Sequence, residues 1–162
     1  MYVYANTPRN SSTLLGQKVR SQFSGNVDAA LVKITNSEYE MSSVTQYLSV
    51  TLLQSYVVPS ENMYVYKEGA KTGSTAGRVE ACNVDITYGD VVVEDLIMTS
   101  ALNLPGDSGG VMYNAAHHTI LGSMSGTGHS GLNDEITAET FICSYACGVY
   151  EATTALNCTV WD

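Results

Sequence analysis

The sequence has 162 residues, which suits one compact domain or two very small ones. Hydrophobic residues make up 44% and charged residues only 14%, a composition that excludes a disordered chain and is common in secreted β-proteins. The net charge of −9 argues against nucleic-acid or anionic-membrane partners, and no apolar run is long enough to span a bilayer.

Short strands separated by turn residues account for most of the chain. We expect strands over residues 10–22, 28–34, 43–53, 62–67, 77–88, 90–99, 110–113 and 119–126. Within 62–67, Met63 and Val65 alternate with Tyr64 and Tyr66, so the two pairs should lie on opposite faces. Gly89 marks a hairpin turn between two of the strands.

One helix is expected near the C-terminus. Within residues 149–157, Val149, Ala152 and Leu156 fall on one helical face. Many short strands with frequent turns favour an all-β sandwich or barrel, to which this short helix is appended.

The four cysteines are compatible with two chemical states. Cys82, Cys143, Cys147 and Cys158 do not have the spacing of a zinc site, so no metal and no cofactor are expected. Disulfides remain possible if the protein is exported, and free buried thiols remain equally possible.

The stretch Gly106-Asp107-Ser108-Gly109-Gly110 carries the chemistry of the sequence. A serine hydroxyl attacks a carbonyl only when a base removes its proton and hydrogen-bond donors stabilise the oxyanion. Glycines allow a tight turn that directs successive backbone N–H groups into one small space. The run therefore predicts a nucleophilic serine with an oxyanion hole.

This stretch resembles the nucleophile loop of chymotrypsin-like serine proteases. Four further segments resemble the bacterial branch that contains alpha-lytic protease and the streptogrisins, and they occur in the family's order. They are "FSGNVDAALVKI" (23–34), "VYKEGAKTGSTAGRV" (65–79), "LGSMSGT" (121–127) and "VYEATTALNCTVW" (149–161). The resemblance covers the chain from about residue 13 to its end.

The resemblance implies an all-β double antiparallel β-barrel. The first barrel would be incomplete and would occupy residues 1–60. The second would occupy residues 61–162 and would carry the nucleophile loop and the C-terminal helix. The resemblance also implies a secreted or cell-surface protein that acts on peptide or protein substrates. The first residues do not have the pattern of a signal peptide, so we expect an intracellular start or a cut inside a longer precursor.

The resemblance also implies catalytic roles. Ser108 would be the acylating nucleophile, and Asp28 would orient the imidazolium of a histidine. The N–H groups of Gly106 and Ser108 would form the oxyanion hole. Asp107 would be structural, buried and paired with a partner that the sequence does not identify.

Substrate binding would involve Ser125, Gly126 and Thr127, whose strand would pair with the bound peptide. Leu102 lies six positions before Ser108, where trypsin-like members have an acidic residue, so Lys or Arg specificity is not expected. A small-to-medium apolar side chain is the default preference. An acidic one, favoured by His129, is the alternative, although His129 also fits a loop residue without function.

The sequence departs from the family pattern at the general base. The family's histidine precedes its aspartate, but no histidine precedes Ser108 here. His117 and His118 are expected in a loop where neither can act as the base. Three hypotheses follow: the true chain begins further upstream, another chain supplies the histidine, or the protein is a pseudoprotease that binds peptides without cutting them. The first is preferred, and this chain alone should be nearly inactive. A structural or adhesive β-domain is a third functional class.

Overall fold

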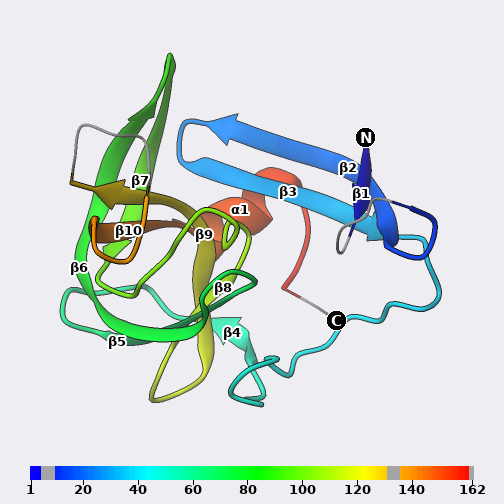
Figure 1. Cartoon of the computed structure of the whole chain (residues 1–162), viewed down its shortest axis with the longest axis horizontal. Coiled ribbons are helices and arrows are strands. Elements are labelled where there is room, and N and C mark those ends of the chain that lie inside the picture. Colours follow the sequence, from blue (N-terminus) through cyan, green and yellow to red (C-terminus); the bar gives the residue numbers. More distant parts are fainter. Residues whose placement is uncertain (5–9, 131–135, 161–162) are drawn as a thin grey trace.

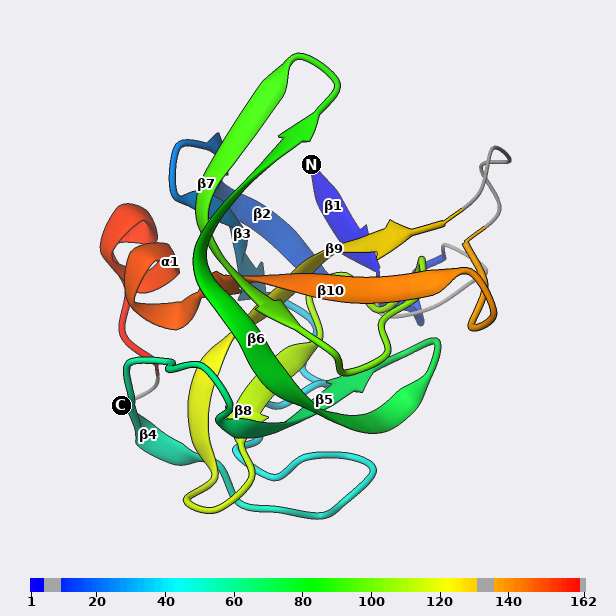
Figure 2. The same cartoon turned by 90° about the vertical axis from the view of Figure 1, so that its left-hand side faces the viewer.

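The computed structural model describes residues 1–4, 10–130 and 136–160 (Figures 1 and 2). These residues form two sheet systems, antiparallel apart from one parallel pair of strands, and one short helix, as the resemblance implied. The first system is a three-stranded sheet in the order β1-β2-β3. Its strands are β1 (Tyr2–Tyr4), β2 (Leu14–Ser24) and β3 (Val27–Ile34).

The second system is a closed barrel. Its sheet has the order β10-β7-β6-β5-β8-β9-β4, and an additional pairing between β10 and β9 closes six of these strands into a ring. The strands are β4 (Leu53–Tyr56), β5 (Tyr64–Gly69), β6 (Gly73–Tyr88), β7 (Val91–Thr99), β8 (Val111–Asn114), β9 (Thr119–His129) and β10 (Phe141–Gly148). β4 lies outside the ring and pairs in parallel with β9.

Alternating side chains fill the inside of the ring. Val65, Val79, Met112 and Leu121, from four different strands, are each at most 1% exposed and belong to one apolar cluster. A second cluster, which includes Val27, joins the three-stranded sheet to the barrel and to the helix. The two systems therefore pack together through apolar contacts as well as through hydrogen bonds.

The helix α1 (Val149–Leu156) packs against strands of both sheet systems. Leu156 is buried, and Asn157 adopts φ 49° as the C-cap, where its N–H bonds to the carbonyls of Thr153 and Thr154. The guanidinium of Arg20, on β2, donates to the carbonyl of Leu156 at 2.8 Å. This places a cation at the negative end of the helix.

Most expected strands and the expected helix are present, but the strand expected at 43–53 is wrong. This segment forms turns and an isolated bridge between Val44 and Thr51. The carboxylate of Glu68 accepts hydrogen bonds from the N–H groups of Tyr47 and Leu48 at 2.9 and 3.2 Å, and these contacts hold the segment as a loop. Strand β10 was not expected at all.

The cysteines are free thiols in the structure, so the disulfide alternative is not realised. Burial raises the pKa of Cys82 and of Cys147, which makes these thiols poor nucleophiles. Within the described residues, no group of His, Cys, Asp and Glu side chains is arranged to hold a metal ion. Among the same residues, no helix has the length and apolar character needed to cross a membrane.

Candidate active site

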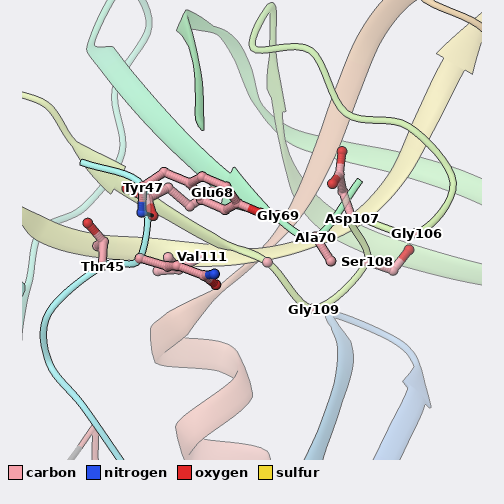
Figure 3. A pocket seen from close by; sticks show the side chains of 12 residues that line it. Thr45, Tyr47, Glu68, Gly69, Ala70, Gly106, Asp107, Ser108, Gly109 and Val111 are labelled. Carbon is pink, nitrogen blue, oxygen red and sulfur yellow. Dashed lines mark hydrogen bonds between the residues drawn. The ribbon is translucent and has the colours of Figure 1, made fainter. Parts of the chain in front are cut away.

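The nucleophile loop is a tight turn between residue 103 and β8 (Figure 3). Gly106 and Gly109 have φ angles of 109° and 85°, which side-chain-bearing residues rarely adopt. Inside the turn, the N–H of Gly110 donates to the carbonyl of Asp107 at 2.8 Å. Gly109 and Gly110 also pair with Met124 on β9, through bonds of 2.9 and 2.8 Å. The glycines therefore fix the loop against β9, with the side chain of Ser108 exposed.

Two backbone N–H groups of this turn have no carbonyl acceptor among the described residues. Those of Asp107, Gly109 and Gly110 each bond to a carbonyl oxygen. In the described part of the chain, the N–H groups of Gly106 and Ser108 make no such bond. These are the two donors that the sequence suggested for an oxyanion hole, and they are free to bind a ligand oxygen.

The side chain of Asp107 stabilises the shape of the nucleophile loop. Its buried carboxylate accepts bonds from the ammonium of Lys67 at 3.1 Å, the hydroxyl of Thr72 at 2.7 Å, and the N–H groups of Leu104, Lys71 and Thr72 at 2.7–3.0 Å. Burial opposes ionisation, but these donors together hold the pKa of Asp107 well below its usual range. Lys67 is the partner that the sequence did not identify, and it also bonds to the hydroxyl of Thr72.

Ser125 links Asp28 to Ser108. Its hydroxyl donates to the carboxylate of Asp28 at 2.6 Å, and its carbonyl oxygen lies 3.5 Å from the hydroxyl of Ser108. The hydroxyls of Tyr88 and Ser125 are 3.3 Å apart. Ser125 of β9 thus contacts both Asp28 on β3 and Ser108 beside β8, so the two residues lie close to each other.

The segment Ser125–Thr127 is tied to the nucleophile loop by a residue that the sequence reasoning missed. Asn103 donates to the carbonyl of Gly126 at 3.3 Å and to the hydroxyl of Thr127 at 3.0 Å. Thr127 in turn donates to the carbonyl of Asn103 at 2.9 Å. Leu102 is half-buried, and its carbonyl accepts a bond from the hydroxyl of Thr75.

The three histidines lie away from these contacts. His117 is exposed in the turn between β8 and β9. The ring of His118 packs edge-on against the ring of Tyr113, with 6.4 Å between the two ring centroids. His129 ends β9, opposite Phe141 of β10, and its buried Nδ1 has no hydrogen-bond partner among the residues that the structure describes. Among the described residues, no histidine bonds to Ser108 or Asp28.

A cavity of about 360 Å³ borders the nucleophile loop (Figure 3). The loop from Gly106 to Gly110 forms one wall, and Thr45, Gln46 and Tyr47 form part of another. The cavity therefore borders the loop that carries the Ser108 hydroxyl and the N–H groups of Gly106 and Ser108. The carboxylate of Asp28 is not among the residues that line it and reaches the site through Ser125.

The chain is similar in sequence to peptidases of Streptomyces. Serine protease 2 of Streptomyces fradiae is 34% identical over 127 residues, which cover 74% of this chain and 68% of that protein. Glutamyl endopeptidase 2 of Streptomyces griseus is 27% identical over 133 residues, covering 79% and 70% of the two chains. No family model matches the sequence.

Solved structures show the same relationship. A glutamic-acid-specific serine protease superposes with a TM-score of 0.73 at 29% identity, over 91% of this chain and 74% of that one. An alpha-lytic protease homolog, N4, has a TM-score of 0.74 over 98% of this chain and 78% of its own, and at 24% identity it supports the fold alone.

Proposed function

Because the chain belongs to the bacterial branch of the chymotrypsin-like serine proteases, we propose that it is a serine endopeptidase that cleaves through an acyl-enzyme at Ser108. The observation that carries the proposal is the set of contacts from Ser108 through Ser125 to Asp28. Beside it lie two N–H groups that have no carbonyl acceptor in the described part of the chain.

The proposed reaction uses these groups in order. The hydroxyl oxygen of Ser108 forms a bond to the substrate carbonyl carbon, while a base takes the hydroxyl proton. The resulting oxyanion accepts bonds from the N–H groups of Gly106 and Ser108. The C–N bond then breaks, and the amine leaves with the proton that the base returns. Water completes the cycle by releasing the acyl group from Ser108.

The base in this proposal is a histidine outside these 162 residues, from an upstream segment or a partner chain. Asp28 would orient its ring and stabilise its protonated form. Two observations support this source. The three-stranded sheet pairs β3 with β2 alone, so β3 has an open edge in the described chain, and Asp28 lies on that strand. The cavity beside Ser108 also leaves room for further chain.

Without a base, the chain should be a poor protease. Removing a member of such a triad leaves about 10³–10⁴-fold rate enhancement over water, from the oxyanion hole and binding alone. The runner-up, a pseudoprotease that binds extended peptide along Ser125–Thr127, predicts affinity without turnover. The family resemblance also supports a secreted or cell-surface location, which belongs to this proposal.

The test is covalent labelling with a fluorophosphonate. We expect slow labelling of the 162-residue chain and faster labelling when free imidazole, or a longer chain carrying an upstream histidine, is supplied. Ser108→Ala should abolish labelling, whereas Ser60→Ala, at another exposed serine, should leave it unchanged. Labelling that survives Ser108→Ala would refute the nucleophile. Peptide binding with no labelling under any condition would favour the pseudoprotease.

A further inference from the structure

Tyr88 reaches the candidate site from the end of β6. Its ring centroid lies 5.6 Å from that of Phe23 on β2, and it packs against the apolar cluster that joins the two sheet systems. A Cβ added at Gly126 would overlap the hydroxyl oxygen of Tyr88, so the glycine makes room for this phenol. The packing holds the hydroxyl of Tyr88 3.3 Å from that of Ser125.

The direction of this hydrogen bond follows from the partners of Ser125. Its hydroxyl has one hydrogen, and a carboxylate can only accept. The 2.6 Å separation between the hydroxyl oxygen of Ser125 and Oδ2 of Asp28 commits that hydrogen to Asp28. Tyr88 must therefore donate to Ser125. Burial raises the pKa of Tyr88, and the nearby charge of Asp28 acts in the same direction, so the phenol keeps its proton at neutral pH.

The two bonds form a directed chain, in which Tyr88 donates to Ser125 and Ser125 donates to Asp28. A serine hydroxyl can turn its hydrogen toward any acceptor within reach. With Tyr88 as the donor, turning this hydrogen toward the phenol would place two hydrogens against each other. Consecutive hydrogen bonds also polarise and strengthen one another. The phenol therefore favours the one orientation of Ser125 that holds Oδ2 of Asp28.

The carboxylate depends on this chain because it has few other contacts. In the described part of the structure, Oδ2 of Asp28 accepts the bond from Ser125, and Oδ1 accepts no hydrogen bond. We propose that Tyr88 is a positioning residue of the active site, which keeps the Ser125 hydroxyl on Oδ2 of Asp28 and so leaves Oδ1 to accept the N–H of the histidine. The inference rests on the proposed function, in which Asp28 orients that histidine. Tyr88 itself contacts no reacting atom in this scheme.

The test measures how free imidazole accelerates fluorophosphonate labelling of the full chain. The imidazole response is the labelling rate at a fixed imidazole concentration divided by the rate without imidazole. The rate without imidazole depends on Ser108 and its N–H donors, whereas the response also depends on the carboxylate that stabilises the imidazolium. A purely structural change lowers both rates together and leaves the response unaltered.

Tyr88→Phe removes only the hydroxyl. We expect it to lower the imidazole response about fivefold, which is the effect of one neutral hydrogen bond. Tyr145→Phe is the matched control, because it removes the hydroxyl of another half-buried tyrosine, whose described partner is the thiol of Cys143. This control should leave the response unchanged.

A double-mutant cycle shows whether Tyr88 acts through Ser125. Ser125→Ala should itself lower the imidazole response, and adding Tyr88→Phe should then cause no further loss. Asp28→Asn should remove the response, which ties the readout to that carboxylate.

Four results would overturn the inference and leave Ser108 as the proposed nucleophile. They are an unchanged response in Tyr88→Phe, an equal loss in Tyr145→Phe, a further loss on top of Ser125→Ala, and a response that survives Asp28→Asn. Labelling of the parent chain that imidazole does not accelerate would overturn it too, because no imidazolium would then be held at Asp28. No labelling under any condition would refute the proposed function, and the inference with it.

Discussion

Replacing Asp107 with asparagine tests how the nucleophile loop is held. One carboxylate oxygen accepts the N–H groups of Lys71 and Thr72, and the other accepts bonds from Leu104, Thr72 and Lys67. An asparagine NH₂ group in either position faces at least two donors. The change also leaves the ammonium of Lys67, whose side chain is 0% exposed, without its counter-ion.

The expected cost is large for one isosteric change. Breaking a buried ion pair from one side costs about 3–5 kcal/mol, so we expect Asp107→Asn to destabilise the fold by at least about 4 kcal/mol. With a urea slope of about 2 kcal/mol/M, the unfolding midpoint should fall by about 2 M. Lys67→Met leaves the carboxylate with its Thr72 hydroxyl and three N–H donors, so its cost should be smaller, about 2 kcal/mol.

Urea unfolding followed by fluorescence measures both variants. Asp90→Asn, at an exposed carboxylate, is the matched control and should change stability by less than about 0.5 kcal/mol. The reasoning fails if Lys67→Met is the more destabilised of the pair, or if Asp107→Asn unfolds at the same urea concentration as the control.

Three further outcomes follow from the cluster around Glu68. Gly110→Ala would place a Cβ 2.4 Å from the backbone oxygen of Glu68, so we expect a loss of about 1–3 kcal/mol in the same urea assay. Backbone hydrogen bonds hold the pKa of Glu68 below its usual range despite burial, so the stability that it contributes should be complete above about pH 4.5 and lost as the pH falls; Glu68→Gln should flatten this acid limb in melting curves. Burial and Glu68 raise the pKa of Tyr113 to about 12, so its contribution should be complete below pH 10 and lost as the pH rises through 12, a loss that Tyr113→Phe should remove.

Local patterns in the sequence predicted the elements that depend on neighbouring residues. The glycines of the nucleophile loop and the turn at Gly89 need unusual φ angles, and glycine itself signals that need. The helix from Val149 followed from its periodicity, and β5 from its alternation. Polar and apolar residues also alternate loosely in segment 43–53. Its backbone N–H groups at Tyr47 and Leu48 bond to the carboxylate of Glu68, a residue distant in sequence, and the segment forms a loop.

Contacts between distant segments were beyond the sequence. The pairing of Lys67 with Asp107 spans 40 residues, and that of Ser125 with Asp28 spans 97. Lys67 lies on β5 and Asp107 in the loop before β8, whereas Asp28 and Ser125 lie on β3 and β9, two strands that do not pair with each other. Both contacts therefore depend on how distant segments pack together, which no local pattern specifies. Strand β10 was missed for a related reason: it is buried along much of its length, so it lacks the alternation that marks a half-buried strand. The domain boundary near residue 60 stays a prediction.

In the described structure, the barrel supplies most of the contacts that position the candidate site, and the three-stranded sheet supplies few. Apart from the bonds within the turn itself, the described hydrogen bonds that shape the turn from Leu104 to Gly110 come from the barrel or its loops, through Lys67, Lys71, Thr72 and Met124. The three-stranded sheet reaches the site through Asp28, whose carboxylate accepts one described hydrogen bond, from the hydroxyl of Ser125. Ser108, the proposed nucleophile, and the N–H groups of Gly106 and Ser108 should therefore keep their geometry when the three-stranded sheet is perturbed. The position of the carboxylate, and of any histidine that it orients, should depend on how that sheet is completed.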